Sequence, residues 1–227
     1  MKTLILKTIA LVFFLSTSSL FAQVSTDNMI FVNQQGEEIP FEEIAKLGGK
    51  VKMQQKVLDN GKIQMTVIPI SEEDQKASKA KDEAWKKKWI GQQLPNFSMK
   101  TSQGEKVTNK DLKGKLAVFN FWFIGCKPCV REMPELNKIV EKYSNNDKIV
   151  FLAPNGEDTK EKLTAFTAKR SFKYEVLADA KAFNETLGVY SFPSNFIVDE
   201  NGIIQEVVMG ASSDIAHKLE TLIEKHK

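Results

Sequence analysis

The segment LAVFNFWF, residues 116–123, constrains the fold of this chain more than any other. Its residues are apolar except for Asn120, with no alternation of apolar and polar positions. Such a run is typical of a strand buried on both faces, which requires a sheet that helices cover on both sides. Cys126 and Cys129, the only two cysteines in 227 residues, follow closely after it. A central strand therefore leads into the two most reactive side chains of the chain.

The residues after the cysteines predict a regular succession of helices and strands. Apolar residues recur at spacings of three and four through residues 130–143, which predicts a helix that begins at Cys126. The other predicted elements are a second buried strand at 148–153, helices at 158–171, 181–187 and the C-terminus, and a hairpin around Asn201-Gly202. The segment 174–179 leads into the helix at 181–187. Together they predict an α/β fold with a mixed central sheet and helices on both faces.

The first 22 residues have the features of a secretory signal peptide. Lys2 and Lys7 precede an apolar run from Ile9 to Leu15, and small and polar residues follow up to Ala22. The apolar run is too short to span a bilayer, and no later segment approaches the ~20 apolar residues that a membrane helix requires. We therefore expect cleavage after Ala22 and a periplasmic protein without a membrane span, in a compartment where disulfides form.

Residues 23–89 predict two smaller pieces ahead of the main domain. Within residues 23–70, alternating apolar residues flank Asn60-Gly61, a dipeptide suited to a tight hairpin turn, so we expect a small hairpin-containing module there. Residues 71–89 are polar except for a thin stripe of alanine and tryptophan, which predicts a charged linker helix. The main domain then occupies residues 90–227.

The charge of the chain indicates neither a nucleic-acid nor a membrane-surface partner. There are 32 basic and 29 acidic residues, and loss of Lys2 and Lys7 with the signal peptide would bring the two nearly into balance. The run Lys86–Lys88 lies close to acidic residues, as expected for the solvated face of a helix.

The two cysteines have three possible interpretations: metal ligands, a structural disulfide, or a redox pair. Zinc needs three or four ligands, and the only histidines, His217 and His226, both fall in the last predicted helix, so we expect no metal site. A disulfide between residues three apart closes too small a loop to stabilise the fold much. At a helix start, however, both sulfurs lie within bonding reach, so the pair can open and close with little movement.

The position of Cys126 at a helix start favours its thiolate. The unpaired N–H groups and the positive dipole end of the helix depress the pKa of Cys126, and the adjacent Lys127 adds positive charge. Pro128 has no N–H to leave unpaired, and its fixed backbone angle suits the first turn. These local features favour a reactive dithiol that works without a further cofactor.

Four segments, in this order, resemble the thioredoxin superfamily, and in particular the secreted TlpA/ResA-like thiol-disulfide oxidoreductases. They are IGQQLPNFSM at 90–99, CKPC at 126–129, Pro134 in the following helix, and SFPSNFIVD at 191–199. The resemblance covers residues 90–227 and implies a thioredoxin-like fold preceded by a small N-terminal α+β extension. It also implies that Cys126 attacks, that Cys129 resolves the mixed disulfide, and that Phe192 and a cis Pro193 line the substrate groove.

The sequence departs from that family pattern in two places. Gly125 stands where most relatives have tryptophan before the first cysteine, so we expect a more mobile loop and a flatter docking surface. Asn120 stands where thioredoxins keep a buried aspartate, and Glu132 resembles the buried acid that ResA-like members use instead. We interpret Glu132 as the base for Cys129, although most helical glutamates are solvated. Trp122 resembles a family tryptophan and is expected in the core beneath the site.

These features predict a periplasmic oxidoreductase that exchanges electrons with protein thiols and disulfides. The resemblance implies a reductant, as in cytochrome c maturation, and the Lys-Pro pair lacks the histidine that often helps strong oxidants. The chain has no nicotinamide or flavin motif, so its electrons would come from another protein, such as a membrane-embedded thiol reductase. The alternative is a thioredoxin-fold binding module with little turnover. A peroxidase is disfavoured because FIGC at 123–126 lacks the threonine of a T-x-x-C loop.

Overall fold

The computed structural model describes residues 29–47 and 50–227, which divide into two compact units. The division falls between Gln75 and Lys76, inside helix α2 (Glu72–Trp89). The predicted signal peptide lies outside the described residues, and the predicted domain limits stay a prediction. No helix in the described part of the chain has the length and apolar character needed to cross a membrane.

The first unit contains a three-stranded sheet and one short helix. Its elements are β1 (Met29–Val32), α1 (Phe41–Lys46), β2 (Val51–Val57) and β3 (Ile63–Pro69). Strands β2 and β3 pair antiparallel, so the hairpin predicted around Asn60-Gly61 is present, with Gly61 at a φ of 78°. Strand β1 pairs parallel to β3 and completes the sheet order β1-β3-β2. Among the side chains of this sheet and helix whose burial the structure describes, the buried apolar ones are few: Val32, Ile44 and Val67.

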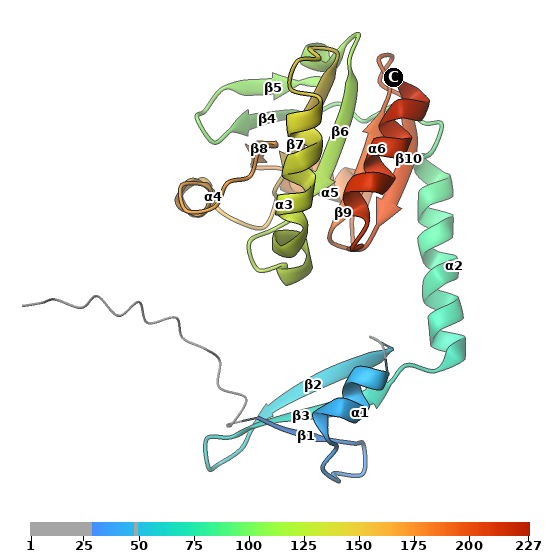
Figure 1. Cartoon of the computed structure of the whole chain (residues 1–227), viewed down its shortest axis with the longest axis vertical. Coiled ribbons are helices and arrows are strands. Elements are labelled where there is room, and N and C mark those ends of the chain that lie inside the picture. The colour runs from blue at the N-terminus through green and yellow to red at the C-terminus, as the bar shows by residue number, and fades with distance from the viewer. Residues whose placement is uncertain (1–28, 48–49) are drawn as a thin grey trace, which may run out of the picture. The chain divides into compact units, whose positions relative to one another are not determined.

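The second unit is built on a seven-stranded mixed sheet with the order β10-β9-β6-β7-β8-β4-β5 (Figure 1). Its strands are β4 (Ser98–Thr101), β5 (Lys106–Thr108), β6 (Leu116–Phe121), β7 (Ile149–Pro154), β8 (Glu175–Ala178), β9 (Ser194–Val198) and β10 (Ile204–Met209). Strands β6, β7 and β8 are parallel, whereas the other neighbouring pairs are antiparallel. This is the mixed central sheet that the sequence predicts.

Helices cover both faces of this sheet. They are the 3-10 helix η2 (Asn109–Leu112), α3 (Lys127–Lys142), α4 (Lys160–Thr167), α5 (Lys181–Leu187) and α6 (Ile215–His226). Helices α3 and α6 lie side by side on one face (Figure 1), where Leu136 and Leu219 belong to one apolar cluster. Helix α5 contributes Phe183 and Leu187 to a second cluster on the opposite face.

Strand β6 joins the two apolar clusters because successive side chains of a strand point to opposite faces. Leu116 and Val118 belong to the cluster of α3 and α6, whereas Ala117, Phe119 and Phe121 belong to the cluster of α5. All six residues of β6 are buried. The prediction of a strand buried on both faces is therefore confirmed, and its carboxyl end is held firmly where the cysteine segment begins.

Most of helix α2 belongs to the second unit by its contacts. The indole N–H groups of Trp85 and Trp89 both donate to the backbone oxygen of Leu187, at 2.9 and 2.7 Å. Trp89 also lies in the apolar cluster of α5. The two tryptophans are thus packing residues at the C-terminal half of α2.

Candidate active site

The two cysteines form a disulfide at the start of helix α3. Cys126 is the N-cap residue, its Cα lies 5.3 Å from that of Cys129, and its Sγ accepts a hydrogen bond of 3.2 Å from the Cys129 N–H. Pro128 occupies the first turn, where a missing N–H costs nothing. Only 6% of the surface of Cys126 and 2% of that of Cys129 is exposed. The structure therefore holds the pair at a helix N-terminus, a position that stabilises a thiolate.

The loop between β6 and Cys126 is fixed by a side chain from the loop that follows strand β7. The N–H of Ile124 donates to Asp158 Oδ2 at 2.8 Å, and the same oxygen accepts from the Asn155 side-chain amide at 3.0 Å. Asn155 is fully buried at the end of β7 and caps the turn that carries Asp158. Sequence reasoning missed both residues. The signal that could have found them is their place after a parallel strand, since the carboxyl ends of parallel strands share one edge of a sheet.

Glu132 lies on α3 three residues after Cys129, and it is buried with 5% of its surface exposed. Its Oε1 is 3.5 Å from the side-chain nitrogen of Asn120, while its Oε2 has no hydrogen-bond partner within the described residues. Burial raises the pKa of Glu132 to about 7, against the opposing effects of Asn120 and of the Ser212 backbone. The structure thus places a carboxyl group that changes protonation near neutral pH one turn beyond Cys129.

Asn120, Asn195 and Glu132 form a polar cluster inside an otherwise apolar core. Asn120 on β6 and Asn195 on β9 are partners in the strand register, and their side chains share a hydrogen bond of 2.9 Å. Asn195 Nδ2 and the hydroxyl of the buried Tyr174 have no partner within the described residues. Burial raises the pKa of Tyr174, and the charge of Glu132 raises it further. Unpaired buried groups are costly, and buried titratable groups with shifted pKa values gather at functional sites.

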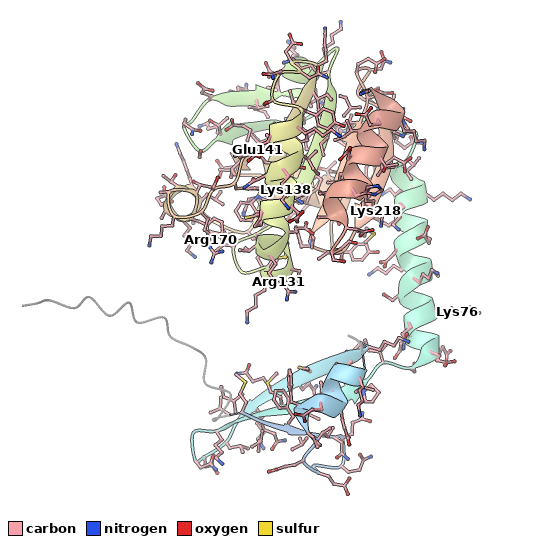
Figure 2. The ribbon with its side chains drawn as sticks, in the orientation of Figure 1. Lys76, Arg131, Lys138, Glu141, Arg170 and Lys218 are labelled. Carbon is pink, nitrogen blue, oxygen red and sulfur yellow. A yellow bond between two sulfur atoms is a disulfide. The ribbon has the colours of Figure 1, made fainter. Side chains whose placement is uncertain are left out.

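A pocket of about 340 Å³ connects Glu132 to the surface. Its wall is formed by Pro128, Arg131, Glu132, Glu135, Ala211, Ser212 and Ser213. Arg131 lies on the N-terminal part of α3 (Figure 2). The pocket gives the buried carboxyl group a route for proton exchange with solvent.

The segment before β9 contains Phe192 and Pro193, the two residues predicted to line the substrate groove. The Phe192–Pro193 peptide bond is cis, Pro193 is buried, and Phe192 is half-buried. The ring of Phe192 meets that of Phe123 edge to face, with 5.3 Å between the ring centroids. Both rings pack against the apolar cluster that contains Cys126 and Cys129. The structure thus brings the β9 segment to the loop that precedes Cys126.

Two predicted modulating residues lie in contrasting surroundings. Lys127 is exposed, so its charge acts from the surface. Trp122 is fully buried, its indole N–H donates to the backbone oxygen of Ala153 at 3.3 Å, and its ring packs on Phe166 and Phe172. Trp122 therefore supports the strand end from inside the core. Within residues 29–47 and 50–227, no group of three or more His, Cys, Asp or Glu side chains is arranged to hold a metal ion.

The fold and this site define a thioredoxin-like protein with a CxxC disulfide. The model of the AhpC/TSA family matches residues 90–207, and the chain belongs to that family. It is 39% identical over 123 residues to the thioredoxin-like protein YneN of Bacillus subtilis, covering 53% of this chain and 71% of YneN. It is 34% identical over 122 residues to the thiol-disulfide oxidoreductase ResA of Bacillus thuringiensis, covering 53% of this chain and 70% of ResA.

A solved structure supports the fold independently. The protein of Chlorobium tepidum assigned as the thiol:disulfide interchange protein DsbE superposes with a TM-score of 0.56. The superposition covers 60% of this chain and 96% of that protein, at 23% sequence identity. The family match and the two relatives confirm the predicted resemblance to thioredoxin-like thiol-disulfide oxidoreductases, and the superposition confirms the fold class.

Proposed function

We propose that this protein is a periplasmic thiol-disulfide oxidoreductase that reduces disulfides in other proteins. The observation that carries the proposal is the Cys126–Cys129 disulfide at a helix N-terminus, with the buried Glu132 one turn away. A metal or a structural disulfide would not require a buried acid of raised pKa beside the pair. The similarity to ResA, which is named a thiol-disulfide oxidoreductase, supports the same reaction.

The reaction begins with the reduced pair. The Cys126 thiolate attacks a substrate disulfide, which forms a mixed disulfide and releases one substrate thiolate that takes up a proton. Glu132 then accepts the proton of the Cys129 thiol, and the Cys129 thiolate attacks the Cys126 sulfur. The Cys126–Cys129 disulfide forms and the second substrate thiolate leaves, so two electrons pass to the substrate. A pKa of about 7 leaves Glu132 partly ionised at neutral pH, as this proton transfer requires.

The residues between the cysteines support the proposed direction of electron flow. Strong oxidants owe their potential to an unusually stable thiolate, whereas the exposed Lys127 carries a flexible, hydrated charge that stabilises a neighbouring thiolate only moderately. We therefore assign the protein as a reductant. Its electrons would come from a membrane-embedded thiol reductase that is accessible from the same side of the membrane. Cytochrome c maturation is the process in which such a reductant would serve.

A redox titration tests the direction. We expect the midpoint potential of the Cys126–Cys129 pair, measured in glutathione buffers by tryptophan fluorescence, to lie nearer −270 mV than −120 mV, both being rough reference values. A midpoint close to the second value would overturn the assignment as a reductant but leave the dithiol chemistry intact.

An insulin-reduction assay with dithiothreitol tests the chemistry itself. The protein should accelerate insulin reduction over dithiothreitol alone, whereas a binding module without turnover should not. The Cys129→Ser variant should remain covalently bound to its substrates because the resolving thiol is missing, and the trapped partners would identify the substrates in the cell.

A further inference from the structure

The side chain of Phe123, and not the backbone conformation, explains why a glycine precedes Cys126. Gly125 does not adopt the left-handed conformation that favours glycine, unlike Gly61 or Gly188. A Cβ atom at position 125 would lie 3.2 Å from Cε2 and 3.5 Å from Cδ2 of Phe123. The Phe123 ring therefore occupies the space beside Gly125 into which another side chain would extend.

The Phe123 ring is held in this place from two sides. It meets the ring of Phe192 at an interplanar angle of 90°, the edge-to-face geometry that aromatic pairs prefer. The backbone of the next residue, Ile124, is fixed by Asp158. Both rings are only half-buried, so the pair presents an ordered apolar surface to solvent beside an exposed Gly125. The surface beside Gly125 is therefore aromatic, and the more mobile loop and flatter docking surface expected from the glycine stay a prediction.

We propose that Phe123 and Phe192 form an aromatic platform that selects protein substrates with an apolar residue next to the reacting cysteine. This inference rests on the proposed function, because the substrate sulfur must reach Cys126. An S–S bond is about 2.05 Å long and successive Cα atoms are about 3.8 Å apart, so the flanking substrate residues must lie against the residues that flank Cys126. Gly125 allows this approach because it has no side chain.

The chemistry of the platform favours an apolar residue next to the reacting cysteine of the substrate and disfavours a basic residue there. Two phenyl rings offer no hydrogen bond to a polar side chain, which would lose its water on binding. A basic side chain would be attracted to the ring faces but repelled by the exposed Lys127 beside Cys126. An aliphatic or aromatic side chain gains by burial against the rings without these costs.

Peptide disulfides provide a direct test. Symmetrical disulfides of short glycine-serine peptides would carry leucine, serine or lysine immediately before the cysteine in one series and immediately after it in another. Reduced full-length protein would be mixed with each peptide and the rate followed by tryptophan fluorescence. Each rate would be divided by the rate of the same variant with hydroxyethyl disulfide, which has no flanking residue. In at least one series we expect leucine peptides to react about tenfold faster than serine peptides.

Variants of the platform should remove this preference. Phe123→Ala should reduce the leucine-to-serine ratio to about twofold, and Phe123→Leu, which keeps an apolar side chain and guards against a failure to fold, should retain an intermediate ratio. Phe41→Ala is the matched control, because Phe41 is an exposed phenylalanine that pairs with Phe31 in the first unit, and it should keep the full ratio.

A double-mutant cycle tests the link between Gly125 and Phe123. Gly125→Ala should lower the ratio by about threefold because the methyl group displaces the Phe123 ring, and it should have no further effect in the Phe123→Ala background.

An equal effect of Gly125→Ala in both backgrounds, an unchanged ratio in Phe123→Ala, or a preference for lysine peptides would overturn the platform. Equal reaction of all peptides would overturn it while the proposed function stands. Failure to reduce any peptide disulfide would remove the proposed function and the platform together.

Discussion

Cys126 and Cys129 are almost equally buried in the disulfide, yet their surroundings differ. The residues on either side of Cys126, Gly125 and Lys127, are exposed. Glu132, on the next turn after Cys129, is buried with a raised pKa. One sulfur therefore adjoins the surface that a partner must meet, and the other adjoins a group that can accept a proton.

The comparison teaches that the groups around each cysteine distinguish Cys126 from Cys129 more clearly than the exposed fraction of each side chain does. The Cys129 N–H already donates to the Cys126 sulfur, and a hydrogen bond to a charged sulfur is stronger than one to a neutral sulfur. A thiolate at Cys129 would instead form among apolar residues such as Met133, where burial raises the pKa of a thiol. Under the proposed function we therefore expect Cys126 to react unaided and Cys129 to need a base.

Removing the sulfur of Cys126 should have the largest effect. Cys126→Ser should lower the rate of disulfide reduction by at least ~10³-fold, whereas Cys129→Ser should still form the mixed disulfide once. In the reduced wild-type protein, iodoacetamide should modify Cys126 well below pH ~8.5, the range of an ordinary thiol, and should not modify Cys129 there. Mass spectrometry of the alkylated protein across pH gives both profiles. Identical profiles for the two thiols would contradict the comparison.

Removing the proton acceptor should slow only the second half of the reaction. Glu132→Gln should leave formation of the mixed disulfide unchanged and slow its resolution by about 10²-fold. The wild-type resolution rate should rise with pH around a midpoint of about 7, as Glu132 ionises, and this step should vanish in the variant. Stopped-flow measurement across pH 5 to 9 separates the two phases.

Glu135→Gln is the matched control for this experiment. Glu135 lines the same pocket and loses the same charge, but it is paired with Lys138 at the surface. Its pH profile should match that of the wild type. If both variants lose the step near pH 7, the effect comes from the charge of the pocket and not from a base at Glu132.

Glu132 should also make the stability of the oxidised protein depend on pH. Because burial raises its pKa from 4.5 to about 7, the folded chain binds more protons than the unfolded chain between these values, and stability falls as pH rises through this range. Glu132→Gln resembles the protonated acid, so it should match the wild type near pH 4 and exceed its free energy of unfolding at pH 8 by at most about 3 kcal/mol. Urea unfolding at both pH values measures this, and equal stability at pH 8 would show that the carboxylate is not penalised by burial.

The sequence predicts much of the Cys129 side of the site because that side is local. The buried strand β6, the helix after Cys126 and the spacing of Glu132 all follow from patterns within 17 consecutive residues, 116–132. The buried state of Glu132 is less local, since it depends on what packs against α3. The resemblance to ResA-like proteins indicated it where periodicity alone did not.

The Cys126 side is harder to predict because its contacts join distant segments. Asp158 reaches Ile124 across 34 positions, and the ring of Phe192 before β9 meets the ring of Phe123 after β6. Both contacts depend on strand pairing between elements that no short turn connects, so no local pattern fixes the register. The position of the Phe123 ring beside Gly125 is likewise a matter of side-chain packing, which sequence periodicity does not determine.

The smallest expected effect concerns the anchor of the loop before Cys126. Asp158→Ala removes the acceptor of the Ile124 N–H and one partner of the buried Asn155. We expect a loss of about 1 kcal/mol of stability and about tenfold faster hydrogen exchange of the Ile124 amide. Asp158→Asn keeps an acceptor oxygen and should restore most of the protection, and Glu157→Ala, at the exposed neighbouring position, should change neither quantity. In the described part of the chain the hydrogen bonds of Asp158 are made with Ile124 and Asn155 and not with Glu132, so the midpoint near pH 7 for resolution should stay where it is in the wild type. A shift of that midpoint in Asp158→Ala would mean that the two sides are coupled, and the division between partner docking at Cys126 and proton transfer at Cys129 would no longer hold.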